Sequence, residues 1–194
     1  MGLNIPLMLD LACPKNKNVS LKLAPLVKEF KPYWFEEPVD GEATRALKEI
    51  KNQTGLRIVT GEKQCGINHF IETLAADAVD IFNPDISSVG GIIDMIKIIE
   101  LSNKNNVRVS PHCWNSMSIA ASAMVHLCMS FPNTEMAEFF PEYIPYTLKF
   151  CNKNFEINNG FIELDNREGL GVKIDTNLLM ENTSSYKFSI LDKN

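Results

Sequence analysis

The sequence predicts an α/β protein, a partial TIM-type (β/α) barrel of about six βα units, and two observations support this. Six short apolar runs each end at an acidic residue or a histidine, and the steps between these residues are 26, 26, 23, 27 and 26. A strand with its covering helix needs about that many residues, so the period is that of a repeated βα unit. Amphipathic patterns of helical length fill the intervals, which indicates a parallel sheet covered by helices.

The six predicted strands are short, and each is followed by one of the residues that define the period. They cover residues 5–9, 33–35, 57–61, 80–84, 108–111 and 136–137, and they lead to Asp10, Glu36, Glu62, Asp85, His112 and Glu138. Parallel strands direct their C-terminal ends to one side of a sheet, so these six side chains should gather at one mouth. Six strands of a barrel leave two open edges. We therefore expect either a piece of a longer protein or edges that a partner copy covers.

Helical patterns separate these strands, and the pattern changes after the last of them. The predicted helices cover residues 19–30, 41–53, 67–76, 92–102 and 116–129. Residues 155–164 read as a hairpin that turns at Asn159-Gly160, and residues 169–175 read as a further strand. We expect one incomplete barrel domain over residues 1–175, followed by a polar C-terminal tail over residues 176–194.

Composition narrows the classes of partner. The 19 basic and 24 acidic residues give a net charge of −5 without a basic cluster, which argues against binding to nucleic acid or to an anionic membrane surface. The longest apolar stretch is too short to span a bilayer, and no signal peptide is visible at Met1. The five cysteines have no CxxC spacing, which is typical of reduced thiols and favours a cytoplasmic location.

The first three acidic residues, Asp10, Glu36 and Glu62, end consecutive strands of the predicted sheet. Neighbouring strands lie about 4.8 Å apart, so three such carboxylates can converge on one ion. Hard oxygen ligands in this number favour Mg²⁺. The alternative is that the acids cap the helices that follow, but glutamate is a poor N-cap.

Asp85 and His112 end the next two strands, and Glu138 ends the sixth. A carboxylate that fixes an imidazole tautomer and raises its pKa makes a general acid/base pair. The alternatives are a core histidine bonded to a backbone carbonyl, and for Glu138 a helix cap or a salt bridge at the rim. A histidine base beside Mg²⁺ suits removal of a proton alpha to a carboxylate, since the ion stabilises the ene-diolate that forms.

These residues resemble the enolase superfamily, and within it the mandelate racemase subgroup. The matching strings are Met8-Leu-Asp10, Trp34-Phe-Glu-Glu-Pro38, Thr60-Gly-Glu62, Asn83-Pro-Asp85 with Gly90-Gly91, Ser110-Pro-His112 and Ala137-Glu138. The resemblance covers residues 5–175 and implies Asp10, Glu36 and Glu62 as Mg²⁺ ligands. It also implies Asp85 and His112 as the catalytic dyad and Glu138 as a contact of the substrate.

The resemblance implies a lyase that dehydrates a sugar acid to a 2-keto-3-deoxy acid. The alternatives are a racemase or epimerase of a 2-hydroxy acid, or an inactive fragment that only binds metal or assembles with a partner. Members of the family begin with a capping domain and two earlier strands, and this sequence is predicted to lack both. We therefore expect a small carboxylate substrate, and either a homo-oligomer or a missing N-terminal partner chain.

Overall fold

A computed structural model describes residues 5–14, 16–114, 118–140, 142, 144–152 and 155–182. Five parallel strands form one sheet in the order of the sequence, β1-β2-β3-β4-β5. They are β1 (Met8–Asp10), β2 (Trp34–Glu36), β3 (Ile58–Thr60), β4 (Ile81–Phe82) and β5 (Arg108–Val109). The parallel sheet and the partial barrel predicted from the 26-residue period are therefore confirmed.

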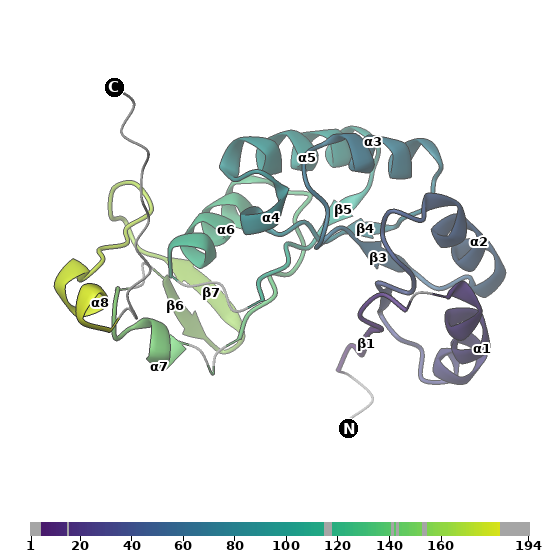
Figure 1. Ribbon diagram of the computed structural model, residues 1–194, viewed down its shortest axis with the longest axis horizontal. Helices are drawn as coiled ribbons and strands as arrows, with labels where there is room; N and C mark the ends of the chain where they lie inside the picture. The colour runs from purple at the N-terminus through teal and green to yellow at the C-terminus, as the bar shows by residue number, and fades with distance from the viewer. Residues whose placement is uncertain are drawn as a thin grey trace.

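Helices α1 (Lys17–Lys28), α2 (Thr44–Thr54), α3 (Asn68–Ala75), α5 (Ile92–Lys104) and α6 (Ser118–Ser130) follow the strands as predicted, with ends that differ by a few residues. Predicted helix residues 116 and 117 lie outside the described part. The short helix α4 (Ile86–Val89) was not predicted. Figure 1 shows the strands and their helices following one another around an arc, with β1 at one end and the β6–β7 hairpin at the other.

The core lies between the sheet and its helices. One cluster joins β4 and β5 to α3, α5 and α6, and it includes the fully buried Phe70, Phe82 and Ile98. A second cluster joins β2 and β3 to α1 and α2 around Phe35 and Leu47. Burying a large apolar side chain contributes about 1.5–3 kcal/mol, so these clusters fix the strands whose ends carry the candidate site.

The sixth predicted strand, 136–137, is wrong as a regular strand. A single parallel bridge joins Val109 to Thr134, and the chain then continues beside β5 with Glu135 N donating to Val109 O (2.9 Å) and Glu138 N donating to Pro111 O (3.2 Å). Pro111 has no N–H to donate to this neighbour, so the ladder is incomplete. We call residues 134–138 the sixth segment, because they follow the path of a strand without its hydrogen-bond pattern.

The C-terminal part contains the predicted hairpin and two differences. Strands β6 (Phe155–Asn158) and β7 (Phe161–Leu164) pair antiparallel, and Asn159 and Gly160 both have positive φ, 52° and 82°. Residues 169–175 do not form a strand, since only Ile174 makes a bridge, to Cys151. Their two glycines at positive φ, Gly169 and Gly171, turn the chain repeatedly and prevent an extended run.

The predicted polar tail, 176–194, begins with helix α8 (Thr176–Asn182), and residues 183–194 lie outside the described part. Asp175 starts this helix because its carboxylate accepts a hydrogen bond from Leu178 N (3.0 Å). A four-residue helix, α7 (Ile144–Thr147), precedes the hairpin. None of the described helices is both long and apolar enough to cross a membrane.

Candidate active site

The first two acidic residues lie side by side at the C-terminal end of the sheet. Asp10 is the last residue of β1, Glu36 is the last residue of β2, and the register pairs them directly. Asp10 is exposed, and its Oδ1 accepts a hydrogen bond from Ala12 N (2.7 Å). The next residue, Glu37, has φ 41° and turns to the other side, where it is 1% exposed and accepts hydrogen bonds from Thr60 Oγ1 and Gly61 N. Glu37 therefore supports the loop and does not face the mouth.

A cavity of about 450 Å³ opens at this end of the sheet. Four of the six predicted residues contribute to its lining, namely Asp10, Glu36, His112 and Glu138, together with Met8, Trp34, Asn83, Ser110, Met136, Ala137 and Gly160. The lining thus comes from β1, β2, the residues that follow β4 and β5, the sixth segment and the tip of the hairpin. The parallel strands bring together acidic side chains that are 128 positions apart, from Asp10 to Glu138.

His112 and Asp85 are in direct contact. His112 Nδ1 lies 2.7 Å from Asp85 Oδ2, while the other oxygen of Asp85 accepts from Ser87 N (2.7 Å) at the start of α4. Burial alone would lower the pKa of the His112 imidazole, but the hydrogen bond to Asp85 and the charges of Glu138 and Glu62 outweigh it, so the pKa is raised. With Nδ1 bonded to Asp85, Nε2 is the nitrogen left to exchange a proton with a ligand.

The Nε2 atom of His112 points toward two further carboxylates. It lies 3.4 Å from Glu62 Oε2 and 3.5 Å from Glu138 Oε2. Glu138 is held by the backbone of the histidine segment, since Cys113 N donates to its Oε2 (2.8 Å). Glu62 does not line the cavity, but it contacts His112, which does. Its Oε1 lies 3.0 Å from Lys63 Nζ. All six predicted residues are therefore linked at one end of the sheet, with Asp85 at Nδ1 of His112 and Glu62 near its Nε2.

Negative charge accumulates around Glu36. Burial and the charges of Asp10, Glu138 and Glu62 raise the pKa of Glu36 from 4.5 to about 7, and His112 opposes this only in part. A carboxyl group beside several others resists ionisation unless a cation shares the site. The mouth is therefore short of positive charge.

The donor set fits the chemistry of Mg²⁺, since Asp10, Glu36 and Glu62 supply hard oxygen atoms and the repulsion around Glu36 would be relieved by a divalent cation. Their geometry is not that of an assembled site. Within the described ranges, no three acidic, histidine or cysteine side chains are grouped so that they could hold a metal ion. The metal assignment of these three residues stays a prediction.

Comparison with known proteins identifies the relatives of this arrangement. The family described as Enolase C-terminal domain-like matches residues 1–178. The chain belongs to this family. A crystal structure of an enolase from environmental shotgun sequencing of the Sargasso Sea is 48% identical, with a TM-score of 0.91, over 95% of this chain and 49% of that one.

Two curated members of the enolase superfamily show how the relatives are named. A D-galactonate dehydratase from Verminephrobacter eiseniae is 30% identical over 81% of this chain and 44% of its own length. A D-galactarolactone cycloisomerase from Agrobacterium fabrum is 27% identical over 93% of this chain and 50% of its own. The chain spans about half the length of these relatives. The resemblance to the enolase superfamily predicted from the sequence is confirmed.

Sequence reasoning missed Asn83 and Ser110 as lining residues of this enolase-type mouth. Asn83 donates from Nδ2 to Glu36 Oε1 (2.6 Å), and Ser110 donates from Oγ to Met136 O (2.7 Å) on the sixth segment. Asn83 stands two residues before the predicted catalytic residue Asp85, and Ser110 stands two residues before the predicted catalytic residue His112. Because side chains alternate along a strand, that spacing is the signal that they point the same way.

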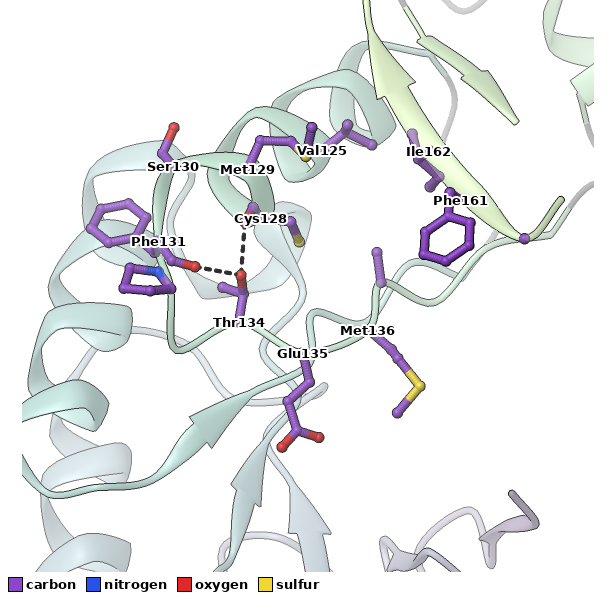
Figure 2. Close-up of a pocket in the computed structure, with 13 residues that line it drawn as sticks. Val125, Cys128, Met129, Ser130, Phe131, Thr134, Glu135, Met136, Phe161 and Ile162 are labelled. Carbon is purple, nitrogen blue, oxygen red and sulfur yellow. Dashed lines mark hydrogen bonds between the residues drawn. The ribbon is translucent and has the colours of Figure 1, made fainter. Parts of the chain in front are cut away.

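A second cavity of about 650 Å³ adjoins the first, since Met136, Ala137 and Gly160 line both. Figure 2 shows it between α6, the turn after Phe131 and the hairpin residues Phe161 and Ile162. Thr134 anchors the turn by donating to Cys128 O and Phe131 O. Apolar side chains dominate this lining, and Glu135 is its acidic member.

Proposed function

We propose that the protein removes a proton alpha to a carboxylate with the help of Mg²⁺, and that it dehydrates a sugar acid to a 2-keto-3-deoxy acid. The observation that carries the proposal is the 2.7 Å contact between His112 Nδ1 and Asp85 Oδ2, with Nε2 directed to the acid-lined cavity. The name of the D-galactonate dehydratase relative supports a sugar acid as substrate.

His112 carries both proton transfers in this proposal. Its neutral Nε2 takes the alpha proton, and Asp85 stabilises the imidazolium because it accepts the Nδ1–H. The electron pair of the broken C–H bond then forms a double bond toward the beta carbon as the beta hydroxyl leaves. His112 gives the proton back to that hydroxyl, so the net change is the loss of one water. The enol product rearranges to the keto acid.

Asp10, Glu36 and Glu62 would hold Mg²⁺, which when bound neutralises the negative charge that develops on the substrate carboxylate. Glu138 lies 3.5 Å from His112 Nε2 and so borders the space where the reacting carbon would lie. We assign it a hydrogen bond to the substrate. A membrane or nucleic-acid partner is not part of the proposal, and the cytoplasmic location and any homo-oligomer or N-terminal partner chain remain predictions.

The test is turnover in D₂O. Incubation with Mg²⁺ and D-galactonate should give a keto acid one water lighter, and mass spectrometry should detect one solvent deuterium at its beta carbon, where the enol takes up a proton as it rearranges. Calorimetry should detect Mg²⁺ binding that Glu62→Ala abolishes. Unchanged Mg²⁺ binding by Glu62→Ala refutes the ligand assignment, and keto-acid formation that does not require Mg²⁺ refutes the mechanism.

Cycloisomerisation is the second candidate, because one relative is named a D-galactarolactone cycloisomerase. An isomerase conserves the mass of its substrate, whereas a dehydratase product is lighter by one water. A racemase or epimerase would also conserve mass but would invert one carbon. Product mass and stereochemistry, measured with D-galactonate and D-galactarolactone, separate the three activities, and absence of all three supports an inactive fragment.

A further inference from the structure

Asn83 is a buried polar residue within the candidate site to which the proposed reaction gives no role. It follows β4 directly, lines the acid cavity and is only 3% exposed. Its Nδ2 donates to Glu36 Oε1 at 2.6 Å, while its Oδ1 is buried without a hydrogen-bond partner. Buried polar atoms are nearly always bonded, so the bond to Glu36 determines how this amide is oriented.

The position of Asn83 in the fold makes it a rigid support. Its N–H donates to Thr60 O (3.1 Å) on β3, and Pro84 restricts its backbone to extended conformations. Strands β2 and β4 are separated by β3, and alternate strands of a barrel contribute side chains to the same inner layer. The Asn83 side chain therefore contacts Glu36 across β3, and its backbone conformation is fixed by the hydrogen bond to Thr60 and by Pro84.

The chemistry of an amide donor suits a carboxylate that must remain available. An arginine or lysine would orient Glu36 and also neutralise it. The amide is uncharged, so it fixes one oxygen and leaves the charge and the second oxygen free for a cation. The reverse amide orientation would set two acceptor oxygens 2.6 Å apart, which is repulsive against an ionised carboxylate.

We propose that Asn83 is a positioning residue that holds the Glu36 carboxylate toward the cavity so that it can bind a divalent cation. This inference rests on the proposed function, since it takes Glu36 as a ligand. Asn83 touches neither a substrate nor a reacting atom in this account and acts only through Glu36.

Asn133 offers a matched control. It is also buried, at 5% exposure, its Nδ2 also donates one hydrogen bond, to Ile99 O (3.0 Å), and its Oδ1 is also without a partner. Its partner is a backbone carbonyl on α5, away from the acids. Asn83→Leu and Asn133→Leu therefore remove equivalent buried hydrogen bonds, and only one of them involves Glu36.

The experiment measures Mg²⁺ affinity by calorimetry on the full chain. Asn83→Leu and the smaller Asn83→Ser should each weaken Mg²⁺ binding about tenfold, because loss of a residue that orients a ligand typically costs that much. Asn133→Leu should bind Mg²⁺ as the wild type does, although it should lose similar thermal stability. Affinity within about twofold of wild type in either Asn83 variant would overturn the inference.

A second readout uses the unsubstituted protein. The side-chain amide signals of Asn83 in ¹⁵N NMR, assigned by their loss in Asn83→Ser, should shift when Mg²⁺ is added, while those of Asn133 should not. Unmoved Asn83 signals at saturating Mg²⁺ would overturn the inference. If the wild type binds no Mg²⁺ in calorimetry, the proposed function fails, whereas intact binding with indifferent Asn83 variants defeats only the role of Asn83.

Discussion

Glu135 at the N-terminal end of the sheet and Glu36 at the C-terminal end are both largely shielded from solvent, but their surroundings differ. Glu135 accepts hydrogen bonds from Tyr33 Oη (2.9 Å) and Arg108 Nε (3.1 Å), and Arg57 Nη2 lies 3.6 Å away. Glu36 accepts one bond from the neutral Asn83 and faces the charges of three other carboxylates. Arginines pair with Glu135, whereas most of the charges that act on Glu36 are those of other carboxylates.

This difference indicates that Glu135 has a structural role and that Glu36 is suited to bind a cation. The contacts of Glu135 join residues next to β2, β3 and β5 to the sixth segment, which has only one bridge to the sheet. They fix this segment, and Glu138 with it. The charge around Glu36 is opposed only in part, by His112, which is unfavourable for folding and is relieved when Glu36 is protonated or when a cation binds.

Substitution of His112 should have the largest effect on the reaction rate, because His112 carries both proton transfers of the proposed reaction. His112→Asn should slow keto-acid formation about 10³-fold by removing the base that takes the alpha proton. His69→Gln, on α3, should leave the rate within a few-fold, since His69 does not line the acid cavity and its Nε2 contacts Thr73 Oγ1 on the same helix (3.1 Å). Deuterium incorporation followed by mass spectrometry measures both, and equal rates in all three proteins would remove His112 from the mechanism.

The next largest effect should be on the pH dependence of the free energy of unfolding, to which Glu36 contributes. The pKa of Glu36 is raised from 4.5 to about 7, so its contribution to stability is present below pH 4.5 and is lost as the pH rises through about 7. The raised pKa of His112 acts in the same direction. Without divalent cations, the free energy of unfolding should fall by about 2 kcal/mol between about pH 5 and pH 8.

Glu36→Gln should flatten this pH dependence, as should saturating Mg²⁺, because each removes the uncompensated charge. Urea titrations at several pH values provide the measurement. A stability that rises with pH in the wild type, or a slope that Glu36→Gln leaves unchanged, would show that the charge at the mouth is compensated in solution.

At neutral pH, Glu36→Gln should raise the free energy of unfolding because it removes uncompensated charge. A glutamate-to-glutamine substitution at Glu135, at the other end of the sheet, should lower it. Glu135→Gln should lower the free energy of unfolding by about 1 kcal/mol at neutral pH, since it weakens bonds to two arginines that are themselves 40% and 46% exposed. Glu163→Gln on the exposed face of β7 is the control and should change stability little. A stabilising effect of Glu135→Gln would contradict the contrast between the two ends.

The smallest effect should come from Lys63, a cation in contact with the mouth. Its Nζ lies 3.0 Å from Glu62 Oε1, and its side chain is 55% exposed, so the pairing is weakened by solvent. Lys63→Met should strengthen Mg²⁺ binding about twofold, because one positive charge is removed beside the predicted ligand. Weaker binding in this variant would indicate that Lys63 instead helps to orient Glu62.

Regular βα units were predictable because each carries its own signal. The apolar period placed β1 to β5 and their helices, and Asn159-Gly160 placed the hairpin turn. The sequence pattern failed to predict secondary structure where a segment depends on the residues that pair with it in the sheet. The sixth segment has the apolar residues of a strand, but its partner offers Pro111 at the position where the ladder should continue.

The sequence alone determined that the six predicted residues end on one side of the sheet, because parallel strands of constant period direct their C-terminal ends to one side whatever the side chains are. Only the tertiary structure decided how these groups are charged and held. Asn83 bonds to Glu36, the predicted partner Asp85 uses Nδ1 of His112 and leaves Nε2 toward the cavity, and Glu135 pairs with arginines at the opposite end. Hydrogen bonds and pKa values depend on distances of a few ångströms between distant parts of the chain, and a one-dimensional pattern contains no such distances.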